Sequence, residues 1–398
     1  MGQLFENEAI DFDDLASQAN SLSDERINQK YARGEVRIVT EQARYPLITI
    51  ADLFSGTDYK MNPEFQRRHR WSAEQQSRLV ESLIMNVPIP PIFLYEDQYS
   101  HYEVMDGLQR LTAIIRLYRD ELVLEGLEEW PELVGKRYSQ LPDKVRRGID
   151  RRYISSIILL HETARTEEEA RRLKQLVFER INSGGVKLEA QESRNAVLNG
   201  PMNQLCVRLG RNISLCKTWL IPEPTSEEVG GGEPSEERLA HPAYRTMEDA
   251  ELVLRFFAFR QNKRRGALKD FLDAYLEHAN RFQPALLQQL ATLFEETVSL
   301  AFELLGERAF MIYRQKKDGS WHWPQRPTKM VYDAVMASLS TRLEHRAKLR
   351  ERRDAILSNL EKLYQEHGSE FEGVYRNVAN LEKRTELFDG VMDRVLTG

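Results

Sequence analysis

The sequence is poor in cysteine and has no long apolar run. Its two cysteines, Cys206 and Cys216, lie in a helical pattern with no histidine at ligand spacing, so neither a disulfide framework nor a zinc site is expected. No stretch approaches the roughly 18 apolar residues that predict a membrane-spanning helix. The N-terminus, MGQLFENEAIDFDD, carries acids where a signal peptide has a basic segment and an apolar run. These absences predict a cytoplasmic protein without membrane contact.

An excess of positive charge is also lacking. The formal net charge of -6 argues against a protein that coats nucleic acid by bulk charge, but it leaves room for a local basic track. One candidate is KVRRGIDRR at 144–152, which we predict as a contact for the DNA backbone. Its cations are Lys144, Arg146, Arg147, Arg151 and Arg152. A solvated surface face is the alternative, and it applies equally to the charge run at 342–353.

Short β-rich runs and capped helical patterns alternate in the first half of the chain, whereas the patterns from residue 245 onward are helical. IFLYE, HYEVM and YISSIILLHE predict strands, ITIADLF also reads as extended, and Ser72 with Gln75 predicts a capping box. The expected fold class is α+β. We predict an acidic N-terminal arm at 1–44, a mixed α/β domain at 45–220, a flexible linker or loop rich in Pro, Gly and Glu at 221–244, and an α-helical domain at 245–398.

The stretch EVMDGLQRLTAIIRLY, residues 103–118, joins a strand to a helix through an acid and a glycine. The first turn of a helix presents unpaired N–H groups and the positive end of the dipole, which favour anions. Arg110 adds a guanidinium suited to phosphate oxygens. Gln109 can hydrogen-bond a base, a sugar or a phosphate, and Asp106 can cap the helix, hold a metal ion or position a water. Alternatively, Asp106 is only an N-cap and Arg110 a surface ion-pair partner.

Three further segments accompany this one: PEFQRRHRW at 63–71, NVPIPPIFL at 86–94 and FERINSGGVKL at 178–188. In this order and spacing, the four segments resemble the N-terminal domain of the GmrSD type IV restriction proteins. The resemblance implies a ParB/sulfiredoxin-like fold over residues 45 to 200. The stretch RTMEDAELVLRFFAFR at 245–260 is similar to the helical extension of family members that stand alone.

The resemblance also implies a site that binds and hydrolyses a nucleoside triphosphate (NTP) with Mg²⁺. The family motif is usually D-G-Q-Q-R. It implies the catalytic residues Asp106, Gln109 and Arg110, with Asp106 also the metal ligand. The implied nucleotide-binding residues are Gln66, Arg67, Gly107, Arg110, Asn182, Gly184 and Gly185. Leu108 departs from the usual first glutamine, so phosphate binding is expected more firmly than hydrolysis. Taken alone, the Asn-Ser-Gly-Gly loop is equally typical of a helix C-cap.

Two-part members of that family carry a histidine-metal nuclease domain, and none of the eight histidines stands in such a motif. The leading hypothesis is an NTP-binding, NTP-hydrolysing module of a prokaryotic anti-phage or restriction-like system that couples nucleotide state to DNA or to a partner protein. One alternative is a metal-dependent DNA nickase with Asp106 and Glu103 or Glu179 around the metal. Another is a non-enzymatic nucleotide or DNA sensor. HWPQRP at 322–327 reads as a loop, with Trp321 and Trp323 in packing or partner contacts.

Overall fold

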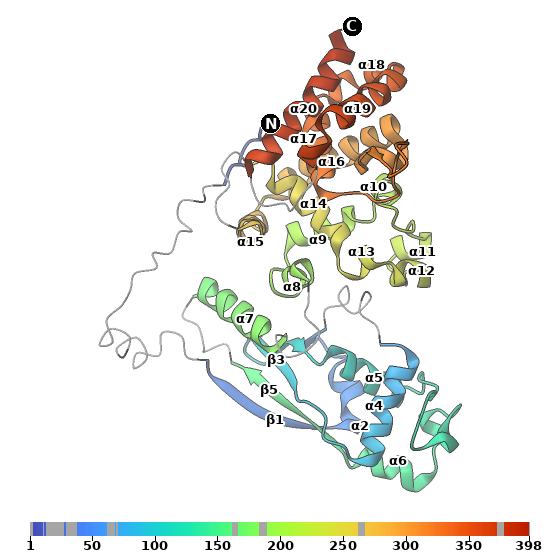
Figure 1. The fold of residues 1–398 in the computed structure, drawn as a ribbon. Helices are drawn as coiled ribbons and strands as arrows, with labels where there is room; N and C mark the ends of the chain where they lie inside the picture. The colour runs from blue at the N-terminus through green and yellow to red at the C-terminus, as the bar shows by residue number, and fades with distance from the viewer. Residues whose placement is uncertain are drawn as a thin grey trace. The chain divides into compact units, whose positions relative to one another are not determined.

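The chain folds into two compact units. The computed structural model describes residues 3–10, 12, 28, 38–61, 68, 71–160, 166–182, 189–261, 267–371 and 378–397. One unit, Ala19–Leu188, is called the α/β unit; the other, Met1–Gln18 with Glu189–Gly398, is called the helical unit (Figure 1). The N-terminal residues thus join the second half of the chain, and the α/β unit is inserted between them.

A five-stranded mixed sheet forms the centre of the α/β unit. Its strands are β1 (Thr40–Pro46), β2 (Tyr59–Lys60), β3 (Ile92–Gln98), β4 (His101–Asp106) and β5 (Tyr153–Leu159), in the order β1-β5-β3-β4-β2. The β1/β5 and β3/β4 pairs are antiparallel, whereas β3/β5 and β2/β4 are parallel. The α+β class is therefore confirmed. The helices are α2 (Leu47–Leu53), α4 (Ala73–Met85), α5 (Leu108–Tyr118), α6 (Asp143–Asp150) and α7 (Glu167–Asn182).

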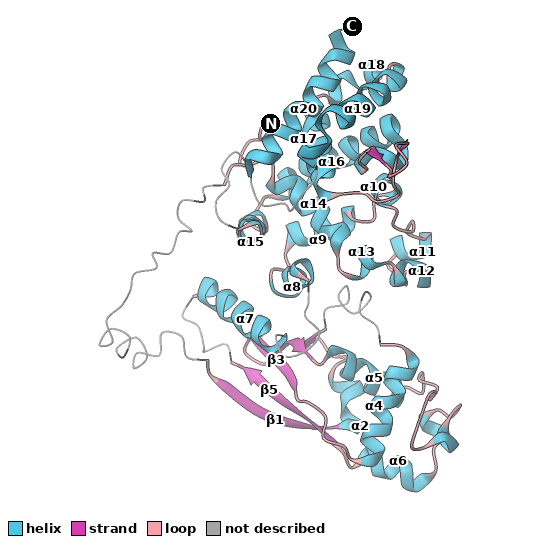
Figure 2. Ribbon diagram, viewed as in Figure 1, coloured by secondary structure: helices cyan, strands magenta, loops and turns pink. Residues whose placement is uncertain are grey.

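Helices cover both faces of this sheet, with α7 apart from α2, α4, α5 and α6 (Figures 1 and 2). The apolar stripe of α5 packs into the core because Leu111, Ile114 and Leu117 recur at helical spacing, and all three are fully buried. Strand β5 alternates exposed and buried residues in its first half, so its N-terminal part is covered on one face only.

Two local predictions in this unit have opposite outcomes. The Ser72–Gln75 capping box is confirmed: the Ser72 side chain accepts from the Gln75 N–H, and the Gln75 side chain accepts from the Ser72 N–H. The extended reading of ITIADLF is wrong, since Leu47–Leu53 is helix α2. Its β-branched residues favour a strand. Leu47 and Ile50, however, lie on one face of the helix and are fully buried in the core, and this burial overrides the β-strand propensity.

The helical unit contains helices and one short two-stranded ribbon among its described residues. The longer helices are α8 (Ala190–Val197), α9 (Pro201–Leu209), α10 (Ile213–Trp219), α14 (Glu248–Ala258), α15 (Leu268–Ala279), α16 (Pro284–Leu305), α17 (Lys329–Ser340), α19 (Arg353–His367) and α20 (Val378–Thr397); the short ones are α11 (Ser226–Val229), α12 (Glu236–Ala240), α13 (Pro242–Arg245) and α18 (Arg346–Glu351). No helix in the described part of the chain is both long and apolar enough to cross a membrane.

Residues 221–244, for which the composition predicted a linker or loop, carry the short helices α11, α12 and α13. Thr225 and Ser235 cap the first two with their side chains. Arg238 on α12 is fully buried and donates to the Glu228 carboxylate at 3.1 Å. Side-chain caps and a buried ion pair therefore order a segment that composition alone marks as flexible.

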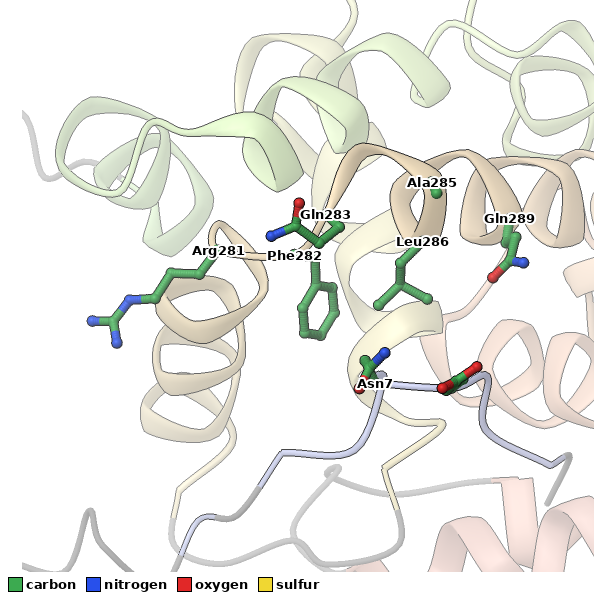
Figure 3. Close-up of a pocket in the computed structure, with 8 residues that line it drawn as sticks. Asn7, Arg281, Phe282, Gln283, Ala285, Leu286 and Gln289 are labelled. Atoms are coloured by element: carbon green, nitrogen blue, oxygen red, sulfur yellow. The ribbon is translucent and has the colours of Figure 1, made fainter.

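The N-terminal residues pack on the helical unit. Glu8 is fully buried, and its carboxylate accepts from Arg260 Nε at 2.6 Å. Phe12 packs against Phe271 of α15, with ring centroids 5.3 Å apart. The same segment borders an open pocket of about 420 Å³ beside the turn between α15 and α16, whose lining includes Asn7 (Figure 3). The described part of the acidic arm is thus a component of this unit.

The two cysteines are free and buried. Burial raises the pKa of the Cys206 thiol, and burial also raises that of Cys216 despite the nearby Arg238 guanidinium. Both thiols therefore stay protonated at neutral pH and are poor nucleophiles.

Two arginines of the charge run at 342–353 pair with a carboxylate of the helical unit. Arg346 Nε donates to the Glu303 carboxylate of α16 at 3.0 Å, and Arg350 Nε donates at 2.6 Å. Burial disfavours the Glu303 carboxylate, but hydrogen bonds from Arg350, Arg346 and Ser299 outweigh it and lower its pKa to about 2. The solvated face predicted for this run holds for the exposed Arg350 and in part for Arg346, although both also bind this carboxylate.

This pair predicts a pH dependence of stability. Since the pKa of Glu303 is lower in the folded than in the unfolded chain, its contribution is present above about pH 4.5 and is lost as the pH falls toward 2. We expect Glu303→Gln to lower the urea midpoint at pH 7 and to lower it much less at pH 2.5, where most of the contribution is lost. The exposed Glu296 lies on the same helix, so Glu296→Gln is the control. Equal effects of Glu303→Gln at both pH values would contradict the assignment.

Candidate nucleotide site

The loop between β4 and α5 places a glycine where no other residue fits. Gly107 is the N-cap of α5 and has a φ of 94°, in the left-handed region. A Cβ on Gly107 would lie 2.4 Å from Ile92 Cγ2. The glycine therefore serves both the backbone turn and the close approach of the helix start to β3. The alternative that Asp106 caps this helix is wrong, because the cap residue is Gly107 and no side chain caps the helix.

Arg110 joins the end of β4 to the loop that precedes β3. Its Nη2 donates to Asp106 Oδ2 at 2.6 Å, and its Nη1 donates to the Pro91 carbonyl at 3.1 Å and also to that of Pro90. The Arg110 side chain is 11% exposed and the Asp106 side chain 35%. Arg110 thus holds the Asp106 carboxylate and the proline loop in one arrangement. The role of both prolines as acceptors depends on the folded chain.

Gln109 has a different partner. Its Oε1 accepts from the Trp71 N–H at 3.0 Å, while Gln76 Nε2 donates to the Trp71 carbonyl at 2.8 Å. Two side-chain amides therefore fix both backbone groups of Trp71. Gln109 Nε2 is buried and has no hydrogen-bond partner in the part of the chain that the structure describes. It is a donor available to a ligand or a water.

Leu108, which departs from the usual D-G-Q-Q-R motif, lies in the hydrophobic core. Its side chain is 7% exposed and belongs to the cluster that contains Ile92 and Leu111. An apolar residue at this position is therefore explained by burial.

Several of the predicted binding residues cannot be located. Gln66, Arg67, Gly184 and Gly185 lie outside the described residues, as do Ser183 and the side chains of Glu179 and Asn182. Helix α7 has Asn182 as its last residue. The structure thus brings together Asp106, Gly107, Gln109 and Arg110 and leaves the other predicted residues as predictions.

The carboxylates near this site do not gather around a metal. Glu103 Oε2 accepts from Lys174 Nζ of α7 at 2.6 Å, and Lys174 also lies over the Tyr95 ring. Asp106 Oδ2 in turn accepts from Arg110 Nη2 at 2.6 Å, so each of the two carboxylates pairs with a cation of its own. The described residues contain no group of three or more His, Cys, Asp or Glu that would hold a metal ion. Glu103 is thus occupied by Lys174, and the nickase hypothesis, whose other candidate carboxylate Glu179 has no described side chain, stays a prediction.

The predicted DNA track lies on α6 and the residues after it. Arg146 and Arg147 pair with Asp143 of the same helix at 2.8 and 3.0 Å. Lys144, Arg147 and Arg151 are exposed, whereas Arg152 is half-buried and its Nε is buried. Three of the five predicted cations therefore point to solvent, which fits both DNA contact and a solvated face.

Residues 50–199 match the family model described as GmrSD restriction endonuclease, N-terminal domain. The match confirms the resemblance drawn from the four sequence segments. It begins within α2, so it leaves out β1, and it ends after α8, which belongs to the helical unit. No curated protein and no solved structure matches the chain. The likeness to the ParB/sulfiredoxin fold stays a prediction.

Proposed function

We propose that this protein acts in a restriction-type defence system, with residues 50–199 as a module that binds and hydrolyses an NTP and couples the nucleotide state to DNA or a partner protein. The family match supports the defence role and DNA as a partner. The observation that carries the nucleotide site is the start of α5, where Gly107, the partly exposed Asp106 and the Nε2 donor of Gln109, which has no partner among the described residues, come together.

Each residue has a role in this proposal. The first-turn N–H groups of α5 and Gln109 Nε2 donate hydrogen bonds to phosphate oxygens. Asp106 orients the attacking water through its carboxylate, and Arg110 keeps that carboxylate in place. Arg110 has both Nη atoms occupied, so it positions Asp106 and the proline loop, and it reaches a phosphate only by exchanging a partner. Positioning and electrostatics are most of what phosphoryl transfer needs.

The residues present fit a metal ion that arrives with the nucleotide. Mg²⁺ is usually held by one or two carboxylates together with substrate phosphates, so Asp106 suffices as the protein ligand. Bound Mg²⁺ would neutralise charge on the phosphate oxygens. The three-ligand cluster that a permanent protein metal site needs is lacking among the described residues, and this favours a metal carried by the substrate.

Asp106→Asn is expected to reduce NTP turnover at least about tenfold while leaving NTP binding within a few-fold. The asparagine keeps an oxygen for Arg110 but loses the charge that orients water. Phosphate release and binding would be measured with each of the four ribonucleoside triphosphates and Mg²⁺. Arg110→Ala is expected to lower both, because the proline loop loses its anchor.

A matched control lies at the other end of the same helix. Arg119 follows α5 and donates to Ser55 Oγ at 2.6 Å, so Arg119→Gln removes a cation without touching the site. It is expected to behave as the wild type. Binding without turnover in the wild type would favour the sensor hypothesis. If no triphosphate binds, the proposed nucleotide site is wrong, and the protein would next be tested for plasmid nicking.

A further inference from the structure

A small β-ribbon extends from the helical unit. Strands β6 (Arg314–Gln315) and β7 (Trp321–His322) are antiparallel, with Arg314 opposite His322 (Figure 2). The Lys316 N–H donates to the Ser320 carbonyl at 2.7 Å and closes the turn, in which Gly319 has a φ of 87°. Asp318 Oδ1 accepts from the N–H of Ser320 at 2.9 Å and from its hydroxyl at 2.6 Å. The turn is thus held by its own sequence, with glycine at the left-handed position.

Aromatic residues fix the ribbon to the helices. Trp321 stacks on Tyr313 with ring centroids 5.4 Å apart. Trp323 lies 5.1 Å from Tyr313 and edge-on to the buried Tyr364 of α19, and its Nε1 donates to Glu361 at 3.3 Å. The prediction that the two tryptophans pack is confirmed. They brace the base of the ribbon, so the orientation of the ribbon on this unit is set by packing.

The ribbon and the residues that follow it directly are strongly basic. Between residues 313 and 327 there are four cations and one acid: Arg314, Lys316, Lys317 and Arg326 against Asp318. All four cations are exposed, and none forms an ion pair with a described residue. Arg342 of the same unit, by contrast, pairs with Asp389 at 2.5 Å and with Asp393 at 2.7 Å. The chain has a net charge of -6, so these four cations form a local positive surface on a packed element, and they are available to an external anionic partner.

We propose that this ribbon is a contact surface for double-stranded DNA, with its four cations on the phosphate backbone. A two-stranded ribbon fits the major groove, and arginine and lysine contacts to phosphate fix a protein on the duplex. The exposed lysines at the tip and the arginines at the base place charge along the whole element. This proposal deepens the proposed function, because it assigns the DNA partner to a surface of the helical unit; it involves neither the α5 site nor the α6 track.

The test is DNA binding by the full chain without nucleotide, measured by fluorescence anisotropy with a 30-base-pair duplex over a range of salt concentrations. One variant replaces the four cations by glutamine. Since each phosphate contact contributes about 0.9 to the slope of log K against log salt, we expect the slope to fall by about 3 to 4. Affinity at roughly 0.1 M salt is expected to fall at least about tenfold. A second variant, Lys316→Gln with Lys317→Gln, changes only exposed tip residues and cannot disturb the aromatic brace; about half of the slope change is expected.

The control removes the same charge from elsewhere on the helical unit. It replaces four exposed cations, Arg208, Arg281, Lys362 and Lys383, by glutamine. If the control weakens binding as much as the ribbon variant, the effect is one of net charge and the proposal is wrong. It is also wrong if the ribbon variants bind as the wild type does, or if the wild type binds no duplex. If the DNA-binding test fails while the wild type hydrolyses NTP, only the ribbon proposal is rejected. If the wild type hydrolyses no NTP while the ribbon variants weaken DNA binding as expected, only the proposed α5 site is rejected.

Discussion

Gly107→Ala is expected to destabilise the α/β unit by about 2–6 kcal/mol, a large share of the roughly 5–15 kcal/mol that stabilises a typical protein. Two costs add. An alanine at a φ of 94° is strained by about 1–3 kcal/mol, and its Cβ would lie 2.4 Å from Ile92 Cγ2, an overlap that costs about 1–3 kcal/mol more. Urea unfolding followed by circular dichroism measures the loss. The position matters for function because α5 starts at Gly107 and carries Gln109 and Arg110.

Two variants separate these costs. Gly135 has a φ of 82° and open space around its Cβ position, so Gly135→Ala tests the backbone strain without the overlap. Ile92→Leu removes the Cγ2 methyl. On its own it is expected to destabilise by less than about 1.5 kcal/mol, and in the Gly107→Ala background it should recover stability, with a coupling of about 0.5–3 kcal/mol. If the effects of the two changes on stability simply add, the overlap with Ile92 does not cause the loss of stability in Gly107→Ala.

The sequence predicted the elements whose cause is local. Strands β3, β4 and β5, the Ser72 cap and the helix after Gly107 follow from side-chain alternation, capping residues and apolar spacing within a few positions. Helix α2 was missed because its β-branched residues favour a strand, and the burial of Leu47 and Ile50 that overrides them comes from distant parts of the chain.

The boundary between the units also depends on distant contacts. Helix α8 lies within the predicted 45–220 domain, yet it belongs to the helical unit. Its Arg194 is 3% exposed and donates to Asp273 at 2.6 Å and Glu251 at 3.3 Å, residues 79 and 57 positions further along the chain. An arginine in an amphipathic helix reads as a surface residue, and only its distant partners explain its burial.

The same reason limits what could be predicted of the site. The sequence brought Asp106 and Arg110 to one turn, as the structure does, because both belong to one short segment. It did not predict that Asp106 and Arg110 pair with each other. It also did not predict that Arg110 donates to the Pro90 and Pro91 carbonyls, because these prolines come close to Arg110 only when the sheet is folded. The choice between ligand binding and positioning for Arg110 therefore depends on contacts that the motif does not contain.

Arg238→Met is expected to destabilise the helical unit by about 3–5 kcal/mol, although it lies in the segment that composition marks as a linker. Arg238 and Glu228 are both fully buried as side chains, and Arg238 also lies over the Tyr244 ring and donates to the Pro222 carbonyl and Cys216 Sγ. Removing the guanidinium leaves a carboxylate in the interior without its main partner. The loss would be measured by urea unfolding at pH 7.

The double variant Glu228→Gln with Arg238→Met should recover much of that loss, because the buried charge is gone and Tyr244 can still donate to the amide oxygen. The control is Arg245→Met on the neighbouring helix α13; Arg245 is exposed, and a change within about 0.5 kcal/mol is expected. If residues 221–244 were a flexible linker, Arg238→Met would lower the free energy of unfolding as little as Arg245→Met does. A large difference between them would instead make residues 221–244 an integral part of the helical unit, so that deleting this segment would unfold the unit rather than shorten a connection.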